Sequence, residues 1–533
     1  MPGAMISAPQ PEAAEAGLLA LKRGGNAIDA AITCALVQGV VDPQMCGIAG
    51  FGSLQIYCPG SDHYFIDFHG NAPSSVTDDM WADLIEGETP DGFGFILKDN
   101  VNDVGYQSVT IPGSLKAYFE AQTKHGTMDW ADVVAPAIDW AERGSIVRPQ
   151  MAGFWNVEDG SGRVQTRERL RFSETGRKVY FNDDGSLKKL GQTIHNPDLA
   201  NTLRMIAKDG ADVFYRGEIA EKIAADMAVH GGFLTLEDLK QYETVKTSPL
   251  WGDYRGYQYA TNQPPGGGIM LVQMLNILEK FDLSKLGHNT TEYIRIVTEA
   301  MKRATCDKDN FVGDPAFFDV PVERLCDKSY AEELATSIRM GERAAVERYP
   351  TAESSKTTHV SVVDKQGNAV TMTHSLGMPS GVITEGLGFM YNGCMGVFDP
   401  RPGRADSLAP GKSRFSSMCP TIVFDDSRPY VVVGAPGGTQ IAMGVLQSLL
   451  NVIDFDMNMQ QAVSVPRFSS TSNSIDVSNR IPRYITQPLE QSGYEVARSP
   501  LSFAFALVHG IQIKETEMNG GADPGGDGIV LGL

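Results

Sequence analysis

The 533-residue sequence predicts an α+β fold in which helices pack against antiparallel β-sheet. Three observations lead to this prediction: two Ala-rich helical runs near the start, a mainly helical pattern from about 125 to 345, and alternating apolar and polar residues after about 351. With 42% hydrophobic and 21% charged residues, the composition is that of a globular protein. The length fits two domains or one large multilayered unit.

The first two helices are predicted from the residues at their ends. Pro11 opens an Ala- and Leu-rich run that stops at Gly24-Gly25. Asn26 then caps a second run that continues through Val41. Both runs are rich enough in apolar residues to be buried helices.

Two β-hairpins are predicted in the last third of the chain. TTHVSVVDKQGNAVTMTHS alternates apolar and polar residues on both sides of the turn at 364–368, and PTIVFDDSRPYVVVG pairs two apolar strands across 425–429. A helix with one apolar face follows the second hairpin. The stretch 399–416, rich in proline and glycine, is expected to be a loop that covers a site.

The charge balance excludes several classes of partner. The sequence has 45 basic and 65 acidic residues, a formal charge of -20, which repels phosphate backbones and anionic membrane surfaces. No stretch approaches the roughly 18 unbroken apolar residues of a membrane span, and no basic segment followed by an apolar one opens the sequence. We therefore expect a cytoplasmic enzyme with no nucleic-acid and no membrane partner.

Cysteine and histidine spacing gives no sign of a metal site. The seven cysteines are scattered without a CxxC pair, and the nine histidines include no HExxH motif. Free thiols are the expected state of the cysteines. The predicted chemistry uses no metal and no cofactor.

Seven short motifs occur in order along almost the whole chain. They are RGGNAIDAA near the start, VTIPGS at 109–114, LGHNTTEY at 286–293, GDPAFFDVPVERL at 313–325, TTHVSVVDKQGNAV at 357–370, SSMCPTIV at 416–423 and GAPGG at 434–438. Together they resemble the gamma-glutamyltransferase family. The resemblance implies an N-terminal-nucleophile hydrolase, with a four-layer αββα core and a large helical portion.

Members of this family cut their own precursor just before the first threonine of the TTH motif. Carried over, Lys356-Thr357 is the cleavage site, and 1–356 and 357–533 are a large and a small subunit paired in one αββα core. The chemistry is reasonable, because a freed α-amine can take the proton of the Thr357 hydroxyl without a histidine. An α-amine has a pKa of about 7.7 to 8.0, so a usable fraction is neutral near pH 7.

The resemblance assigns further residues to the catalytic and binding site. Gly437 and Gly438 occupy the oxyanion positions, where backbone amides approach a tetrahedral intermediate closely. Ser375 stands where the family usually has a threonine that hydrogen-bonds the nucleophile. Ser416 and Ser417 match the serine pair that helps hold the α-carboxylate of a glutamyl group.

The departures from the family pattern concern recognition of the glutamyl head group. His69 replaces the arginine that pairs with the carboxylate, so a bidentate ion pair is lost, and the imidazole either binds substrate or only packs. Gly377 replaces an asparagine, and the family's NNxMDDF reads NGCMGVF from Asn392 onward, without either aspartate. A substrate ammonium buried there lacks its usual acidic partners.

These changes predict an amidase that keeps the acyl-transfer chemistry but acts on a γ-glutamyl-like compound or a dicarboxylic monoamide, with water favoured over an amino acid as acceptor. Arg401, Arg404 and Arg414 are candidates for a new carboxylate contact. Two alternatives stay open: a slowly processed or uncut family member with a structural or binding role, and an unrelated protein with chance motifs.

Overall fold

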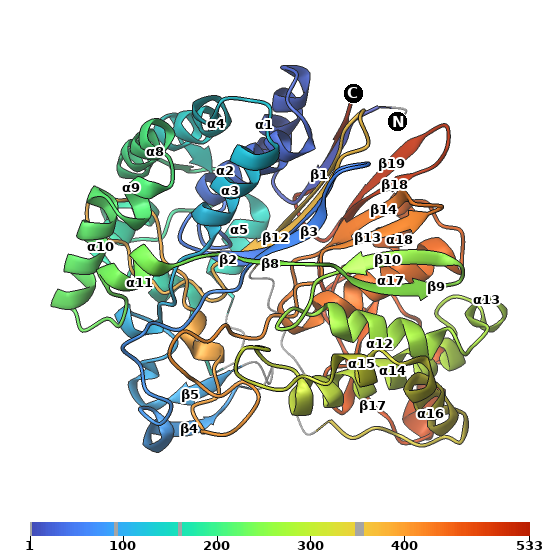
Figure 1. Cartoon of the computed structure of the whole chain (residues 1–533). Coiled ribbons are helices and arrows are strands. Elements are labelled where there is room, and N and C mark those ends of the chain that lie inside the picture. The colour runs from blue at the N-terminus through green and yellow to red at the C-terminus, as the bar shows by residue number, and fades with distance from the viewer. Residues whose placement is uncertain (1–2, 90–93, 158–161, 347–356) are drawn as a thin grey trace.

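Two β-sheets pack face to face between two layers of helices in the computed structural model (Figure 1). The structure describes residues 3–89, 94–157, 162–346 and 357–533. This arrangement is the four-layer αββα sandwich that the family resemblance implies. Neighbouring strands are antiparallel throughout both large sheets.

The first sheet has seven strands. In spatial order they are β20 (Ile529–Gly532), β1 (Met5–Ala8), β11 (Thr358–Val363), β12 (Ala369–Ser375), β2 (Phe51–Tyr57), β3 (His63–Phe68) and β8 (Val245–Thr247). The second sheet has six, in the order β19 (Met518–Ala522), β18 (His509–Ile513), β14 (Arg428–Gly434), β13 (Thr421–Asp425), β10 (Tyr257–Thr261) and β9 (Leu250–Tyr254). Both sheets therefore combine strands from before residue 347 with strands from after residue 356.

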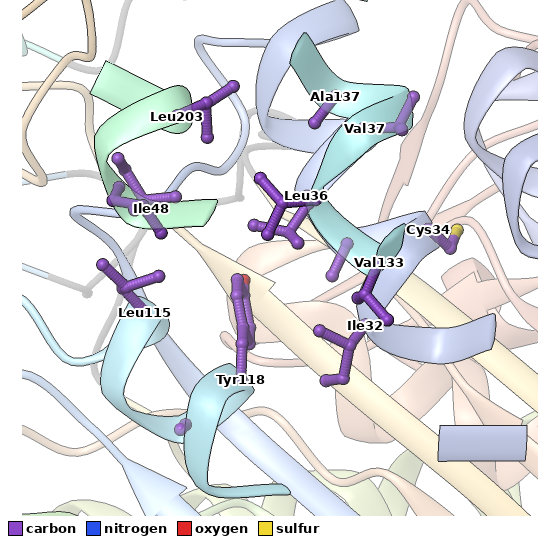
Figure 2. Close-up of a cluster of buried hydrophobic side chains, with 14 of the residues drawn as sticks. Ile32, Cys34, Leu36, Val37, Ile48, Leu115, Tyr118, Val133, Ala137 and Leu203 are labelled. Carbon is purple, nitrogen blue, oxygen red and sulfur yellow. The ribbon is translucent and has the colours of Figure 1, made fainter. Parts of the chain in front are cut away.

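One helical layer covers the outer face of the first sheet. Its main helices are α1 (Pro11–Lys22), α2 (Ala27–Val41), α3 (Ser114–His125), α4 (Trp130–Arg143) and α8 (Pro197–Asp209). Figure 2 shows how side chains of α2, α3, α4 and α8 meet in one apolar cluster, with Leu36, Tyr118 and Leu203 among them. This cluster holds the helices that lie behind β11 and β12.

The other layer covers the second sheet. It contains α12 (Gly268–Leu278), α14 (Thr291–Phe311), α16 (Lys328–Arg339), α17 (Ile441–Ile453), α18 (Met459–Ser464) and α19 (Arg483–Gln491). A second large apolar cluster joins these helices to β13 and β14. None of the helices in the described part of the chain combines the length and the apolar composition that crossing a membrane requires.

The remaining α-helices and the small sheets lie outside these main layers. They are α5 (Pro149–Trp155), α6 (Thr166–Leu170), α7 (Glu174–Tyr180), α9 (Asp212–Tyr215), α10 (Glu218–Val229), α11 (Leu236–Gln241), α13 (Leu283–Leu286) and α15 (Val322–Leu325), with the small sheets β4 (Ile85–Glu88) and β5 (Phe95–Leu97), β6 (Ser145–Ile146) and β7 (Thr193–Ile194), and β15 (Phe468–Ser469), β16 (Ser474–Val477) and β17 (Glu495–Arg498).

Several elements confirm the local sequence signals. Asn26 caps α2 by accepting from the amides of Ile28 and Asp29, and the Asp29 carboxylate accepts from the Asn26 amide, which completes a capping box. The two predicted hairpins are β11–β12 and β13–β14, and α17 follows the second one as expected.

Candidate active site

Four residues lie in one row across the end of the first sheet. Ser375 pairs directly with Phe51 between β12 and β2. The β11–β12 pairing ends with Thr358 opposite His374, and the β2–β3 pairing ends with Gly52 opposite Phe68. One residue further along each register, Thr357 lies opposite Ser375 and His69 lies opposite Phe51. Directly opposed side chains in antiparallel strands share a face. That face points toward the second sheet, because His359, two residues after Thr357, packs against β14.

Thr357 stands immediately before β11 with only 8% of its surface exposed. Its hydroxyl donates to Ser375 Oγ across 3.4 Å, and the same Oγ accepts from the Gly377 amide at 2.8 Å. The structure thus brings together the predicted nucleophile and the serine expected to bond it. Lys356, the other half of the predicted cleavage site, lies outside the described residues.

The glycine turn begins where β14 ends, at the same edge of the sandwich as the start of β11. Gly437 and Gly438 have φ values of 152° and 56°, which favour glycine. A Cβ atom on Gly437 would lie 2.7 Å from Ala506, so the turn has no room for a side chain. The amide of Leu507 donates to the carbonyl of Pro436 at 2.9 Å, which fixes the turn from the other side.

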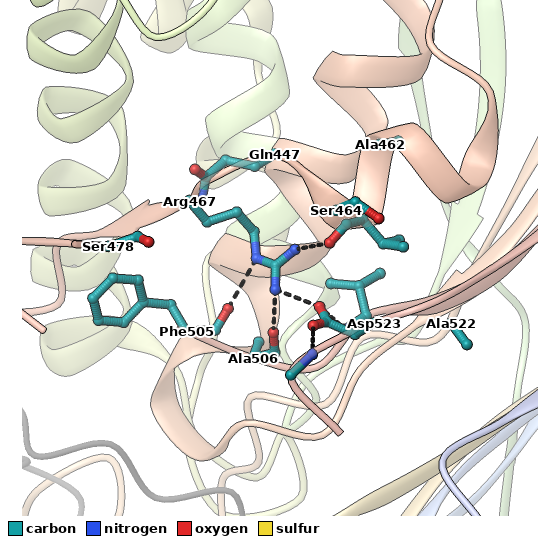
Figure 3. Close-up of polar contacts among 12 residues, drawn as sticks. Gln447, Ala462, Ser464, Arg467, Ser478, Phe505, Ala506, Ala522 and Asp523 are labelled. Carbon is teal, nitrogen blue, oxygen red and sulfur yellow. Dashed lines mark hydrogen bonds and ion pairs between the residues drawn. The ribbon is translucent and has the colours of Figure 1, made fainter. Parts of the chain in front are cut away.

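A buried arginine anchors the loop behind this turn (Figure 3). Arg467 donates to the carbonyls of Phe505 at 3.1 Å and Ala506 at 2.8 Å, and it forms an ion pair with buried Asp523. Phe505 and Ala506 both have positive φ, a costly conformation for residues other than glycine. The ion pair therefore holds a strained segment against Gly437.

The serine pair lies beside the glycine turn. Ser417 Oγ donates to the carbonyl of Gly438, and so ties the pair to the predicted oxyanion position. The amide of Ser416 donates to the carbonyl of Pro265 at 2.8 Å, while its Oγ accepts from the Met418 amide at 3.3 Å. The predicted carboxylate-binding serines are thus held between the turn and the loop before α12.

His69 is buried at the far end of the row. Its Nε2 lies 3.3 Å from Asp67 Oδ1 without hydrogen-bonding geometry, and neither ring nitrogen has a hydrogen-bond partner among the described residues. Asp67 itself accepts from Ser53 Oγ at 2.5 Å and Thr247 Oγ1 at 3.0 Å. A buried, unsatisfied imidazole is costly, and a ligand can satisfy it.

Asn392 is placed differently from the other predicted binding residues. It is fully buried, and its Oδ1 accepts from the Thr110 amide at 3.0 Å and the Thr110 hydroxyl at 2.8 Å. Its Nδ2 donates to the carbonyls of Ala49 and Thr110. These bonds occupy the amide and join three chain segments, so its position favours a structural role.

The three loop arginines have different environments. Arg401 is paired with Asp399 at 2.8 Å and Glu88 at 2.9 Å, and Arg404 is exposed with its Nε 3.7 Å from Asp399. Arg414 is only 2% exposed. Its guanidinium lies 4.6 Å from the ring centre of Phe51, the third residue of the row. Phe51 was not predicted, because an apolar residue in a glycine-rich segment carries no chemical signal.

The buried histidines near the nucleophile are poor bases. His374 accepts from the Tyr118 hydroxyl at 2.6 Å and donates to Gln38 Oε1 at 2.8 Å. Burial lowers the pKa of His374 to about 3, and it holds the pKa of His359 well below its ordinary value. A general base works best when its pKa is near the operating pH. Neither histidine is therefore suited to act as the base of a reaction at Thr357.

The αββα sandwich, with a threonine at the start of a central strand and a glycine turn beside it, defines an amide hydrolase of the N-terminal-nucleophile type. In the described part of the chain, no group of three or more His, Cys, Asp or Glu side chains is arranged to hold a metal ion.

The chain belongs to the gamma-glutamyltranspeptidase family, whose sequence pattern matches residues 13–533. It is 35% identical to the Acylase ACY 1 proenzyme of a Pseudomonas species over 93% of this chain and 88% of that protein. It is also 35% identical to the glutathione hydrolase proenzyme of Escherichia coli over 98% of this chain and 90% of that protein. The structure resembles a cephalosporin acylase from Bacillus halodurans with a TM-score of 0.88 and 31% identity, over 99% and 95% of the two chains. The chain is therefore an amidohydrolase or acyltransferase of this self-processing family.

Proposed function

We propose that the chain cuts itself between Lys356 and Thr357, and that the two products stay together as one enzyme. The observation that carries this proposal is the position of Thr357 at the start of β11, with its hydroxyl on Ser375. Both sheets contain strands from 1–356 and strands from 357–533, so separating the subunits would open both cores. The name proenzyme, given to two of the relatives, supports the same reading.

In the proposed reaction, the freed α-amine of Thr357 takes the proton of its own hydroxyl, and the oxygen attacks the carbonyl carbon of a small-molecule amide. The backbone amides of Gly437 and Gly438 stabilise the negative oxygen of the tetrahedral intermediate. The leaving amine receives the proton, and an ester on Thr357 remains. Water then attacks that ester, releases the acid and regenerates the hydroxyl. Ser375 orients the nucleophile throughout.

We further propose that the acyl group is a γ-glutamyl-like or dicarboxylic one, held by Ser416, Ser417 and His69, and that water is the preferred acceptor. The names of the relatives, acylases as well as glutathione hydrolases, support an acyl group that is not restricted to ordinary γ-glutamyl. Gly377 and Asn392 complete the predicted pocket, the first as part of its wall and the second by holding the surrounding loops. No cofactor takes part in the proposed reaction.

The test compares hydrolysis of glutathione and γ-glutamyl anilide with hydrolysis of a glutaryl anilide. Turnover of the glutaryl compound supports a changed head-group site, and efficient turnover of the γ-glutamyl compounds alone contradicts it. A protein that stays as one uncut, inactive chain would favour the alternative, a structural or binding role. The cytoplasmic location is a separate proposal, which cell fractionation tests.

A further inference from the structure

Strand β11 loses one of its two neighbours close to the predicted nucleophile. On one side β12 pairs with its whole length, whereas on the other side β1 pairs with it only as far as Ser7 opposite Ser361. Continued by two residues, the β1 register puts Pro9 opposite His359. Proline has no backbone N–H, so β1 cannot donate a hydrogen bond to the His359 carbonyl. The start of β11, next to Thr357, therefore needs another partner on this side.

The side chain of Gln38, in α2, takes the place of the missing strand. It is fully buried, and its Nε2 donates to the His359 carbonyl at 3.0 Å, to the Thr358 hydroxyl at 3.0 Å and to Gln10 Oε1 at 2.7 Å. The Thr358 hydroxyl in turn donates to Gln10 Oε1 at 3.0 Å. Two glutamine side chains thus hold the first residues of β11 from the side of α1 and α2.

Gln38 is itself held by a buried chain of hydrogen bonds. Its Oε1 accepts from His374 Nε2 at 2.8 Å, and His374 Nδ1 accepts from the Tyr118 hydroxyl at 2.6 Å. Gln10 Nε2 donates to Asp42 Oδ2 at 2.7 Å, which connects the chain to the residue that ends α2. Turning the Gln38 amide round would place its oxygen against a backbone carbonyl and its nitrogen against an N–H donor. The network therefore fixes the amide in one orientation.

The position of Gln38 gives it an effect on Thr357 without a direct contact. Successive side chains of a strand point to opposite faces, so Thr358 faces the helices while Thr357 faces the second sheet. Chain ends are poorly ordered unless other groups tie them down. Once the bond before Thr357 is cut, Thr357 becomes such a chain end, and its amine and hydroxyl depend on the anchoring of the two residues that follow.

We propose that Gln38 is a positioning residue of the active site, which anchors Thr358 and His359 in place of a strand and so holds the amine and hydroxyl of Thr357 in reacting position. Gln38 does not touch the substrate, because it lies on the helical side of the first sheet. The inference rests on the proposed function for the free amine at Thr357, whereas the anchoring of 358–359 rests on the hydrogen bonds alone.

Gln38→Met tests this, because methionine has nearly the same length but cannot donate these hydrogen bonds. We expect the kcat of the processed variant for an anilide substrate to fall on the order of 10- to 100-fold, as displacement of a reacting group causes. KM should change little, since no substrate contact is lost. Self-cleavage should be slower. Amide hydrogen exchange in 358–363, followed by mass spectrometry, should be faster than in the wild type.

Gln273→Met is the matched control. Gln273 is a buried glutamine of α12, in the helical layer on the second sheet, and it donates to Asp307. The control should leave kcat and the exchange of 358–363 unchanged. If Gln38→Met does not fold or is not processed, Gln10→Met is the second variant. It removes the acceptor that Gln38 and Thr358 share, and it should lower kcat in the same direction.

Wild-type kcat in processed Gln38→Met overturns the inference, and so does a loss of kcat no larger than that of Gln273→Met. Wild-type kcat in Gln10→Met overturns it where that variant has to be used. A wild-type protein that stays uncut and hydrolyses no amide contradicts the proposed function. In such a protein, faster exchange of 358–363 in Gln38→Met supports the anchoring by Gln38, and unchanged exchange overturns it.

Discussion

Thr357 and Ser375 stand opposite each other at the ends of two neighbouring strands, with their hydroxyl oxygens 3.4 Å apart. The pairing register of β11 and β12 sets this approach, and the Gly377 amide on Ser375 Oγ fixes the second hydroxyl. The predicted nucleophile is thus oriented by the pairing of β11 with β12. Ser375, its hydrogen-bonding neighbour, can then change the rate at which the Thr357 hydroxyl reacts.

Replacing Ser375 tests that neighbour. Ser375→Ala removes a hydrogen bond worth about 1 kcal/mol, so kcat should fall roughly fivefold. Ser375→Thr, which keeps a hydroxyl, should restore most of the rate. Ser380→Ala is a control of similar burial, because Ser380 donates to the Tyr391 carbonyl away from the nucleophile. Steady-state kinetics in which Ser375→Ala matches wild type would argue against this role.

The glycine turn can be tested at Gly437. Gly437→Ala must place a Cβ 2.7 Å from Ala506 and moves the backbone amides, so kcat should fall on the order of 100- to 1,000-fold. KM should change little, because the lost contact is made in the transition state. Gly386→Ala, at φ 76° with open space around it, should cost stability but not rate. Equal kcat in Gly437→Ala and wild type would show that the glycine turn takes no part in the proposed reaction.

The buried ion pair behind the turn predicts a large loss of stability. Arg467→Met leaves Asp523 buried without its charged partner, which costs about 3 to 5 kcal/mol of unfolding free energy. The kcat of the folded fraction should also fall, since the 505–506 loop supports Gly437. Lys178→Met breaks an exposed helical pair with Glu174 and should leave the unfolding free energy almost unchanged. Denaturant titration measures the unfolding free energy of both variants, and equal losses would contradict the buried position of the ion pair between Arg467 and Asp523.

Acid should destabilise the protein through His374. Its pKa is about 3 in the folded chain against 6.5 ordinarily, so between these values the unfolded chain binds more protons and the unfolding free energy falls as the pH is lowered. The unfolding free energy of His374→Gln should therefore change less steeply between pH 6 and 4, by about 1.4 kcal/mol per pH unit. His195→Gln, at an exposed histidine, serves as the control. Parallel curves for His374→Gln and wild type would show that His374 is not buried neutral.

Local signals were enough to predict part of this fold. The capping residue Asn26 and the turns at 364–368 and 425–429 act over a few residues, so α1, α2 and two hairpins could be read from the sequence. Strands β8 to β10, β1 and β20 were not predicted. They are short, and β1 and β20, like β8, pair with strands distant in the sequence, so only the tertiary structure decides their pairing.

The candidate site could likewise be predicted only in part. The sequence motifs predict Thr357, Ser375 and the glycine turn, because each motif is a short run of residues. The place of Arg414 over Phe51 depends on the register of four strands and on the space at Gly377. Nothing in the spacing of three loop arginines distinguishes the buried one from the two that face Asp399. The structural role of Asn392 likewise follows only from its contacts with Thr110 and Ala49.

The proposed mechanism requires a free amine at Thr357, and intact-mass analysis with N-terminal sequencing of the active protein tests this directly. We predict two fragments, one of them beginning at Thr357 with 533 minus 356, or 177, residues. Thr357→Ala should stay uncut and inactive, while Thr357→Ser should still process and hydrolyse amides more slowly. Full amidase activity in a chain whose Lys356–Thr357 bond is intact would contradict the account.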